Sequence, residues 1–219
     1  MNRLLAKYNQ VAESFAERSY ANLGFYMHRR FIVATSWGYP LRSGDSVLEL
    51  GCGDGYLAQL FVQQGFHYRG VDIAPNMVAM ARRRLSETAS NTQLMVADVG
   101  QMSLSEPCDA VLSYMRAFFT YIDDPETVLK RFRPYIRKKI ILDLNPRGSI
   151  PLQTAIEMLE KAGFRHIAWR PFFVPKEKRL PRSLLKVLVA CESLPLLRSF
   201  PLRWKFHVLL KGETEESRL

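Results

Sequence analysis

The residues best suited to chemistry in this chain stand in one glycine-rich stretch, VLELGCGDGY, at Val47–Tyr56. An apolar run carries one acid, Glu49, and glycines then alternate with other residues at Gly51, Gly53 and Gly55. This pattern is typical of a parallel strand that enters a tight turn, where a ligand can lie against bare backbone. A dinucleotide-binding turn also begins with Gly-x-Gly, but its third glycine would fall where this chain has tyrosine. The stretch therefore predicts ligand binding with a spacing that departs from the dinucleotide pattern.

Two further acids stand where the next predicted strands end. Asp72 lies near the end of the apolar stretch Tyr68–Ile73, and Asp98 directly follows Leu94–Ala97. A carboxylate about twenty residues after a glycine turn is placed to accept hydrogen bonds from ribose hydroxyls. One after the third strand can accept from an adenine amino group. Each acid alone could be a solvated loop residue, but three in register with the glycine turn favour the ligand-binding interpretation.

The turn and the acids together resemble the first motifs of the class I S-adenosylmethionine-dependent methyltransferases, in particular the small-molecule and quinone-biosynthesis type (methyltransferase type 11-like). The resemblance covers Val47–Leu210 and implies S-adenosylmethionine as the cofactor, whose amino acid tail and ribose would pass over the glycines. Acids would accept from its ammonium and hydroxyl groups, and their charge would suit the sulfonium. The cofactor-binding positions that we expect are Tyr8, Glu49, Gly51, Cys52, Gly53, Gly55, Asp72, Ile73, Met77, Asp98, Val99 and Ser113.

Strand and helix patterns alternate along the chain after the first strand. The predicted helices are Tyr56–Gly65, Pro75–Leu85, Asp124–Arg133 and Leu152–Ala162. The later strands are Tyr68–Ile73, Leu94–Ala97, Ala110–Tyr114, Lys139–Asn145, Phe164–Trp169 and Trp204–Leu210. This alternation predicts an α/β fold: a doubly wound, mostly parallel, seven-stranded Rossmann-like sheet with helices on both faces. Its site would lie at the carboxyl ends of the strands.

Length and composition fit a single domain over residues 1–219. A chain of 219 residues with 47% hydrophobic residues can bury a sizeable core. The three cysteines, Cys52, Cys108 and Cys191, have no metal-type spacing and are odd in number, which favours free thiols in a reducing compartment and no metal. The N-terminus does not have the pattern of a signal peptide, and no apolar run approaches the span of a bilayer. We therefore expect a cytoplasmic protein.

The net charge of +10 is concentrated near the C-terminus. Between Arg165 and Lys211 there are eleven Lys or Arg and two acids, so this stretch carries +9. A basic surface implies an anionic partner, which can be a nucleic acid, an anionic lipid surface or an acidic substrate.

An insertion at residues 175–201, before the last predicted strand, combines this charge with aliphatic residues. A short helix is predicted, with a broad apolar face made by Leu184, Leu185, Leu188, Val189 and Cys191 and with Val187 beside them. The basic residues that flank it are Arg179, Arg182, Lys186, Arg198 and Arg203. Such an element lies on a membrane interface or covers an apolar pocket. The alternative is a core helix whose apolar face packs on the sheet. Because this insertion is mainly aliphatic, and base stacking would need aromatic residues interleaved with the basic ones, nucleic acid is less favoured than a membrane.

The N-terminal segment, Leu4–Trp37, reads as a helical cap within residues 1–40, rich in aromatic residues. In related methyltransferases a leading helix with a pattern like YNQVAESF closes over the cofactor. The resemblance implies that Tyr8, and also Tyr20 or Tyr26, line the site. The alternative is that these aromatic rings only pack the helix on the core.

The residues that bind the methyl acceptor are expected in the segments that follow the fourth and fifth strands. The candidate substrate-binding residues there are Tyr114, Arg116, Phe118, Asn145 and Arg147. Aromatic rings suit a flat or apolar acceptor, and either arginine could hold an anionic group or be solvated. The Asn-Pro-Pro-aromatic motif of amino-methylating DNA enzymes is lacking after the fourth strand. His28 is the best-placed candidate base, against the alternative of a structural histidine, so the catalytic residues stay unassigned.

These observations predict a methyltransferase that acts on oxygen or carbon of a small, apolar or lipid-like acceptor. Two alternatives stay open: an RNA or protein methyltransferase, and a non-catalytic cofactor-binding regulatory protein recruited to membranes. Peripheral contact with the inner face of an anionic membrane is part of the prediction.

Overall fold

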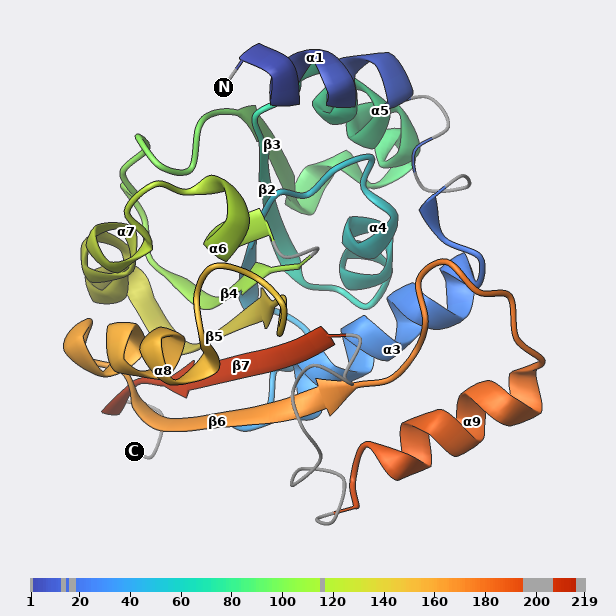
Figure 1. Cartoon of the computed structure of the whole chain (residues 1–219). Helices are drawn as coiled ribbons and strands as arrows, with labels where there is room; N and C mark the ends of the chain where they lie inside the picture. The colour runs from blue at the N-terminus through green and yellow to red at the C-terminus, as the bar shows by residue number, and fades with distance from the viewer. Residues whose placement is uncertain (1, 13–14, 16–18, 115–116, 195–206, 216–219) are drawn as a thin grey trace.

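The computed structural model describes residues 2–12, 15, 19–114, 117–194 and 207–215. In these residues a seven-stranded sheet with the order β3-β2-β1-β4-β5-β7-β6 forms the centre of the molecule (Figure 1). The strands are β1 (Ser46–Leu50), β2 (His67–Asp72), β3 (Thr92–Val96), β4 (Cys108–Ser113), β5 (Ile136–Leu144), β6 (Arg165–Phe172) and β7 (His207–Glu213). Strand β7 pairs antiparallel with β5 and β6, whereas the other pairs are parallel. The carboxyl ends of β1 to β4 therefore meet at one edge of the sheet.

Helices cover both faces of this sheet (Figure 1). They are α1 (Asn2–Val11), α3 (Leu23–Ser36), α4 (Tyr56–Gln63), α5 (Pro75–Arg84), α6 (Ala117–Tyr121), α7 (Pro125–Phe132), α8 (Leu152–Lys161) and α9 (Arg182–Cys191), with short 3-10 turns at Ser86–Asn91 and Arg133–Tyr135. The predicted architecture is thus confirmed, with helix and strand bounds within a few residues of those expected.

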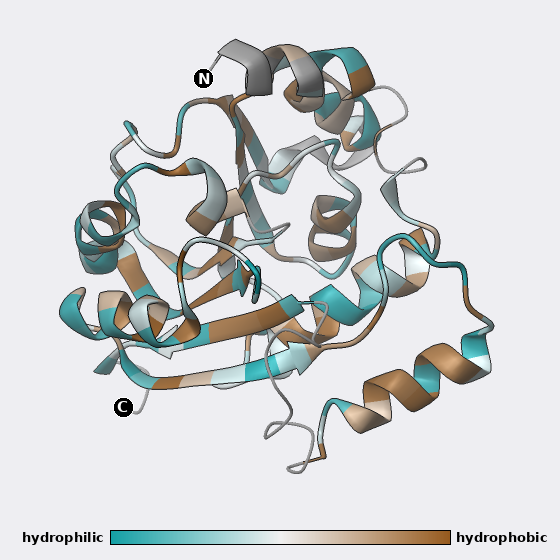
Figure 2. Cartoon of the chain, viewed as in Figure 1, coloured by the Kyte–Doolittle hydropathy of each residue, from teal (hydrophilic) through white to brown (hydrophobic). Residues whose placement is uncertain are grey.

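Two hydrophobic clusters, one on each face, hold the helices to the sheet. Strand β1 contributes to both because successive side chains point to opposite faces: Val47 packs with α3 and α4, and Leu48 with α7 and α8. Both faces of the central strands are apolar, as expected for strands that are covered on both sides. Figure 2 shows this as brown segments along the inner strands.

Local signals in the sequence mark the start of α7 and the end of α8. The Asp124 side chain accepts a hydrogen bond from the Thr127 backbone N–H at 3.1 Å and caps α7, with Pro125 in the first turn. Gly163 follows α8 with φ of +87°, a conformation that glycine adopts at little cost.

The N-terminal segment differs from the single helical stretch expected over Leu4–Trp37. Two described helices, α1 and α3, replace it, and Asn22 lies at the start of the second. The Asn22 side chain donates to the Lys178 carbonyl at 2.7 Å and accepts from the Leu180 N–H at 3.3 Å. Asparagine that bonds to backbone in this way competes with helix continuation. The short helix α6 was not predicted from the sequence.

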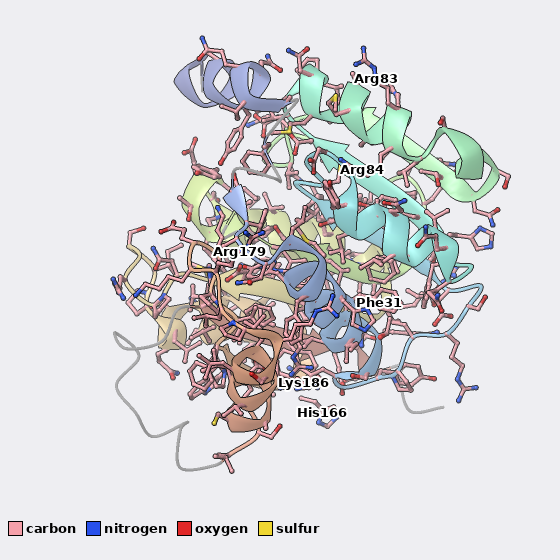
Figure 3. All side chains as sticks on the ribbon, turned by 90° about the vertical axis from the view of Figure 1, so that its right-hand side faces the viewer. Phe31, Arg83, Arg84, His166, Arg179 and Lys186 are labelled. Carbon is pink, nitrogen blue, oxygen red and sulfur yellow. The ribbon has the colours of Figure 1, made fainter. Side chains whose placement is uncertain are left out.

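The insertion before β7 contains helix α9, which lies at the periphery of the molecule next to α3 (Figure 1). Figure 3 views the protein from this side and labels Arg179 and Lys186. Residues 195–206, which include the end of the insertion and the predicted start of the last strand at Trp204, lie outside the described residues. In the part of the chain that the structure describes, no helix is long and apolar enough to cross a membrane.

Candidate functional site

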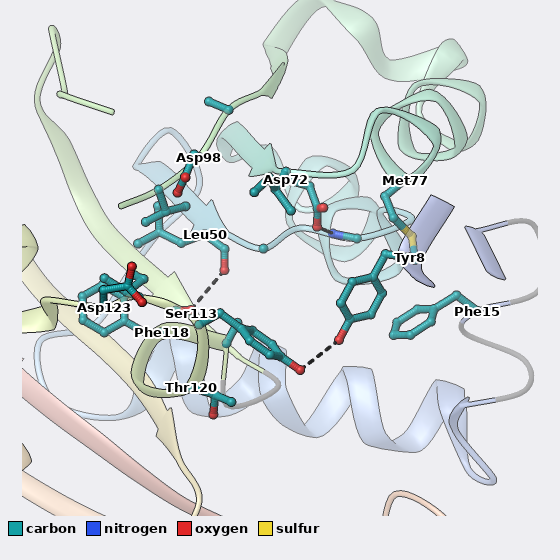
Figure 4. Close-up of a pocket in the computed structure, with 18 residues that line it drawn as sticks. Tyr8, Phe15, Leu50, Asp72, Met77, Asp98, Ser113, Phe118, Thr120 and Asp123 are labelled. Atoms are coloured by element: carbon teal, nitrogen blue, oxygen red, sulfur yellow. Dashed lines mark hydrogen bonds between the residues drawn. The ribbon is translucent and has the colours of Figure 1, made fainter. Parts of the chain in front are cut away.

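A pocket of about 540 Å³ opens at the carboxyl edge of the sheet (Figure 4). Its walls come from α1, the glycine turn after β1, the ends of β2 to β4, and α6. Residues that line it and were expected to bind the cofactor or acceptor are Tyr8, Gly51, Gly53, Asp72, Ile73, Met77, Asp98, Val99, Ser113 and Phe118. Residues outside the predicted binding sets also line it, namely Phe15, Leu50, Ala97, Ala117, Thr120, Tyr121, Ile122 and Asp123.

The glycine turn exposes backbone to this pocket. Gly51 and Gly53 have φ of +80° and +56°, in the region that favours glycine. Apart from its chain neighbours, no atom of the described residues lies within 4 Å of a Cβ atom built on Gly53, so a ligand can approach the turn there.

Gly55, the third glycine of the turn, serves helix packing and does not line a pocket. It begins α4 with φ of +82°, and a Cβ built on it would lie 3.0 Å from the Cβ and 3.1 Å from the Cα of Ala81. Gly55 therefore permits close packing of α4 on α5, and it lines neither this pocket nor the smaller one described below.

Asp72 ties the glycine turn to the start of α5. One carboxylate oxygen accepts from the Gly53 N–H and the other from the Ala74 N–H, both at 2.9 Å. Burial raises the pKa of this carboxyl, while the backbone hydrogen bonds oppose the shift. Because each carboxylate oxygen has a second lone pair, the group can also accept from a ligand in the pocket. Across the pocket, Asp98 accepts from the Gly100 N–H at 2.8 Å.

A smaller pocket of about 40 Å³ lies on the other side of the glycine turn. Phe15, Gly51 and Gly53 line both pockets, so the two are neighbours. Three residues of the sequence prediction line only the smaller one: Glu49, Cys52 and Tyr114. Tyr20 lines it too.

Glu49 is a buried carboxyl group in this smaller pocket. Its oxygen accepts from the Tyr68 hydroxyl at 2.5 Å. Burial raises the pKa of Glu49 to about 8, against the lowering effects of the Tyr68 hydrogen bond and the Arg30 charge. A cationic group placed here would favour the ionised carboxylate.

Arg30, on α3, is a residue of this pocket that the sequence analysis missed. Its Nη2 donates to the Tyr26 hydroxyl at 2.6 Å and to Asp143 Oδ2 at 2.9 Å, and its guanidinium lies 4.3 Å from the centre of the Tyr114 ring. The residue is 1% exposed. Among the described residues, nothing accepts a hydrogen bond from its Nε or Nη1. Buried polar groups are normally hydrogen-bonded, and leaving one without a partner destabilises the fold. An anionic group in the pocket would accept hydrogen bonds from these N–H groups.

Asp143, near the end of β5, anchors this arginine. Its Oδ1 lies 3.2 Å from Nδ1 of His207 on β7. Burial acts to raise the pKa of Asp143, but His207 and Arg30 outweigh it and hold the pKa at about 2. The carboxylate therefore stays charged and fixes Arg30 in place. The sequence signal for this arginine is its position four residues after Tyr26, in a helix that also carries Phe25 and Phe31.

Aromatic side chains close the larger pocket. The Tyr8 hydroxyl of α1 lies 3.3 Å from the Tyr121 hydroxyl of α6, and the Phe15 ring meets the Tyr8 ring edge-on at 5.7 Å (Figure 4). Hydrogen bonds at 3.1 Å between Asn9 and Asn76 hold α1 against α5. Helix α1 therefore lies against α5 and places Tyr8 in the wall of the larger pocket.

The structure does not bring every candidate to the site. Asn145 and Arg147 line neither pocket, and the Asn145 side chain instead accepts from the Arg147 N–H at 3.1 Å to close a local turn. His28 is exposed on α3 and lines neither pocket either, so it is not placed as a base. Arg116 lies outside the described residues.

The described lining of the larger pocket has side chains that can bind and orient a ligand. Its acids are Asp72, Asp98 and Asp123, it includes two tyrosines, and its described part holds no histidine. No cluster of ligands that could hold a metal ion occurs among the residues the structure places.

Comparison with known proteins agrees with this geometry. Residues 47–139 match the family profile described as a methyltransferase domain. A malonyl-[acyl-carrier protein] O-methyltransferase from Acetivibrio thermocellus is 35% identical over 157 residues, covering 70% of this chain and 53% of the relative. A ubiquinone biosynthesis O-methyltransferase from Xylella fastidiosa is 24% identical over 87 residues, covering 40% of this chain and 35% of the relative. The matched part thus spans about half or less of these curated relatives.

Solved structures share the fold. A methyltransferase in complex with the Haloferax volcanii Trm112 activator has a TM-score of 0.68 at 16% identity, over 95% of this chain and 97% of that chain. Magnesium protoporphyrin IX methyltransferase from Synechocystis, with bound S-adenosylmethionine, has a TM-score of 0.59 at 16% identity, over 95% and 97%. The predicted class I fold and the predicted resemblance to methyltransferases are confirmed. The Synechocystis structure holds S-adenosylmethionine, the cofactor that the sequence predicts for this chain.

Proposed function

We propose that this chain, in which residues 47–139 form a methyltransferase domain, transfers a methyl group from S-adenosylmethionine to a small acceptor. The observation that carries the proposal is the open space above Gly53, bordered by the Asp72 carboxylate that the turn itself holds. A ligand can lie there against backbone while a strand-end acid accepts from its hydroxyls.

The residues present fit the cofactor. Asp72 would accept from the ribose hydroxyls, Asp98 from the adenine amino group, and Met77 would pack beside them. The smaller pocket offers a carboxyl group at Glu49 and N–H groups of Arg30 for which the described residues supply no acceptor. These groups match the ammonium and carboxylate of an amino acid tail. The bound cofactor would supply an activated methyl group on a sulfonium leaving group.

The protein's own contribution would be alignment and exclusion of water. Tyr8 and Tyr121 close the pocket, and Phe118 and Ile122 make the wall beside α6 apolar. This lining supports a flat or apolar acceptor, methylated at oxygen or carbon. We propose an acceptor that is strongly nucleophilic or already ionised, so that the transfer needs no protein base.

Titration calorimetry tests the cofactor half of the proposal. S-adenosylmethionine and S-adenosylhomocysteine are expected to bind, and NADH is not. Binding of NADH with no response to S-adenosylhomocysteine would overturn the assignment. Incubation of the purified chain and labelled cofactor with lipid and small-molecule extracts would then identify the acceptor.

Two other functions remain as outcomes of these measurements. Labelled RNA or protein in such a screen, with no labelled small molecule, would favour a macromolecular acceptor. Tight cofactor binding without turnover on any extract would favour a regulatory protein. We propose a cytoplasmic location with peripheral membrane contact.

A further inference from the structure

Helix α9 presents apolar side chains to solvent. Leu184, Val187 and, just after the helix, Leu194 are 43%, 55% and 50% exposed. Leu184, Val187 and Leu188 follow a helical i, i+3, i+4 spacing, so they lie along one side of α9. Figure 2 shows brown bands along this helix at the edge of the molecule. Exposed apolar residues gathered in this way mark an interaction surface.

Cations accompany this apolar strip. Arg182 and Lys186 are exposed on α9, and Lys178 and Arg179 are exposed in the segment that leads into it (Figure 3). Glu177 is the exposed acid of this segment. Long basic side chains can keep their charged ends at a lipid headgroup while their stems lie along an apolar surface.

The inner side of α9 is fixed to the protein. Leu185 is 1% exposed and packs in the core cluster that includes α3. Directly after the helix, Glu192 is buried and accepts from Arg29 at 2.5 Å, Arg170 at 3.2 Å and the Phe173 N–H at 3.0 Å. Helix α9 therefore packs on the protein through one side, as the core-helix alternative predicts. Its opposite side carries the exposed apolar strip.

The described part of the insertion does not act as a lid. None of residues 175–194 lines either pocket. The exposed strip of α9 therefore borders neither pocket.

We propose that α9 and its basic lead-in form a docking surface for an anionic lipid bilayer. Leu184 and Val187 would enter the interface, and Lys178, Arg179, Arg182 and Lys186 would meet lipid phosphates and other anionic headgroups. A bilayer matches both properties at once, because it offers an apolar layer beneath a negative surface. This inference deepens the proposed function, since an apolar acceptor would be met at such a surface.

Vesicle flotation of the full-length chain tests this surface. Vesicles of phosphatidylcholine alone are compared with vesicles containing phosphatidylglycerol, at low and high salt. Binding is expected only to the anionic vesicles and should fall as salt rises. Val187→Asp is expected to abolish it, whereas Met95→Asp, at a residue 49% exposed on β3, should leave it unchanged.

A double substitution of two basic residues distinguishes electrostatic attraction to the bilayer from non-specific hydrophobic adsorption. Arg182→Gln with Lys186→Gln is expected to weaken binding to anionic vesicles on the order of 30-fold. The matched control is Arg83→Gln with Arg137→Gln, which removes two exposed cations from α5 and β5. Thermal unfolding and S-adenosylhomocysteine binding by all variants verify that the fold is kept.

Several results would overturn the inference. These are no binding to anionic vesicles at low salt, equal binding to neutral ones, or binding that Val187→Asp does not change. Val187-dependent self-association in sedimentation velocity without vesicles would assign the strip to a second copy of the chain instead. Vesicle binding requires neither cofactor nor turnover, so its failure is distinguishable from failure of the proposed function.

Discussion

The hydroxyl groups of Tyr8 and Tyr121 meet at 3.3 Å across the mouth of the larger pocket. One belongs to α1 and the other to α6, and they are 113 residues apart in sequence. Their contact joins the N-terminal cap to the wall that follows β4. The cap therefore closes over a site formed by the sheet rather than forming a site of its own.

Removal of the Tyr8 ring should open this contact. We expect Tyr8→Ala to weaken S-adenosylhomocysteine binding about tenfold, because the pocket loses an aromatic wall and gains water. Tyr8→Phe should lose only about threefold, since it keeps the ring and loses one partly exposed hydrogen bond. Calorimetry measures both, and equal affinities of Tyr8→Ala and wild type would contradict a role for the cap.

A side chain at Gly53 should block the site. Gly53→Val places a branched side chain in the open space of the pocket, and we expect no measurable binding of S-adenosylhomocysteine. The variant also pays about 1–2 kcal/mol for a positive φ. Gly44→Val is the matched control, because Gly44 has φ of +90°, open space around its Cβ position, and no place in either pocket. It should lose stability and keep binding, whereas binding by Gly53→Val would refute the assignment of the turn.

Arg30 should be required for both binding and stability. We expect Arg30→Lys to weaken S-adenosylhomocysteine binding between about 10-fold and 100-fold, because lysine keeps the charge and loses the planar set of N–H donors. Arg30→Met also removes a partner of the buried Asp143 carboxylate, at a cost of about 3–5 kcal/mol in unfolding free energy.

The double variant Arg30→Met with Asp143→Asn separates these two effects. It should recover part of the stability in denaturant unfolding and none of the affinity. Recovery of binding along with stability would mean that Arg30 acts only on the fold.

Glu49 should make stability depend on pH. Its pKa is about 8 in the folded chain against 4.5 ordinarily, so between these values the folded chain holds more protons than the unfolded one. The unfolding free energy should therefore fall as pH rises from about 5 to 8. Glu49→Gln cannot ionise, and its stability relative to wild type should increase across the same window in denaturant titrations.

Proton release on binding checks the same residue. A cationic tail beside Glu49 would lower its pKa, so S-adenosylhomocysteine should release protons at pH 7. Calorimetry in buffers of different ionisation enthalpy measures this release, which Glu49→Gln should abolish. An unchanged release in the variant would place the ammonium group elsewhere.

The sequence by itself determined the strands, the glycine turn and the acids at the strand ends. Each of these features can be recognised from a short stretch of sequence. Examples are the apolar run before Gly51, the positive φ of Gly53, and the carboxylates Asp72 and Asp98 at strand ends. Since parallel strands end at one edge, their order along the chain was enough to bring these residues together.

Only the tertiary structure decided what surrounds that edge. Arg30 and Asp143 are 113 residues apart, and their pairing depends on how α3 packs on β5. The break before α3 depends on contacts of Asn22 with residues 178 and 180, which no local pattern encodes. The side of α9 that faces solvent was likewise set by which of its apolar residues the core could accommodate. Leu185 was buried and Val187 was not, because burial depends on distant partners and not on residue type.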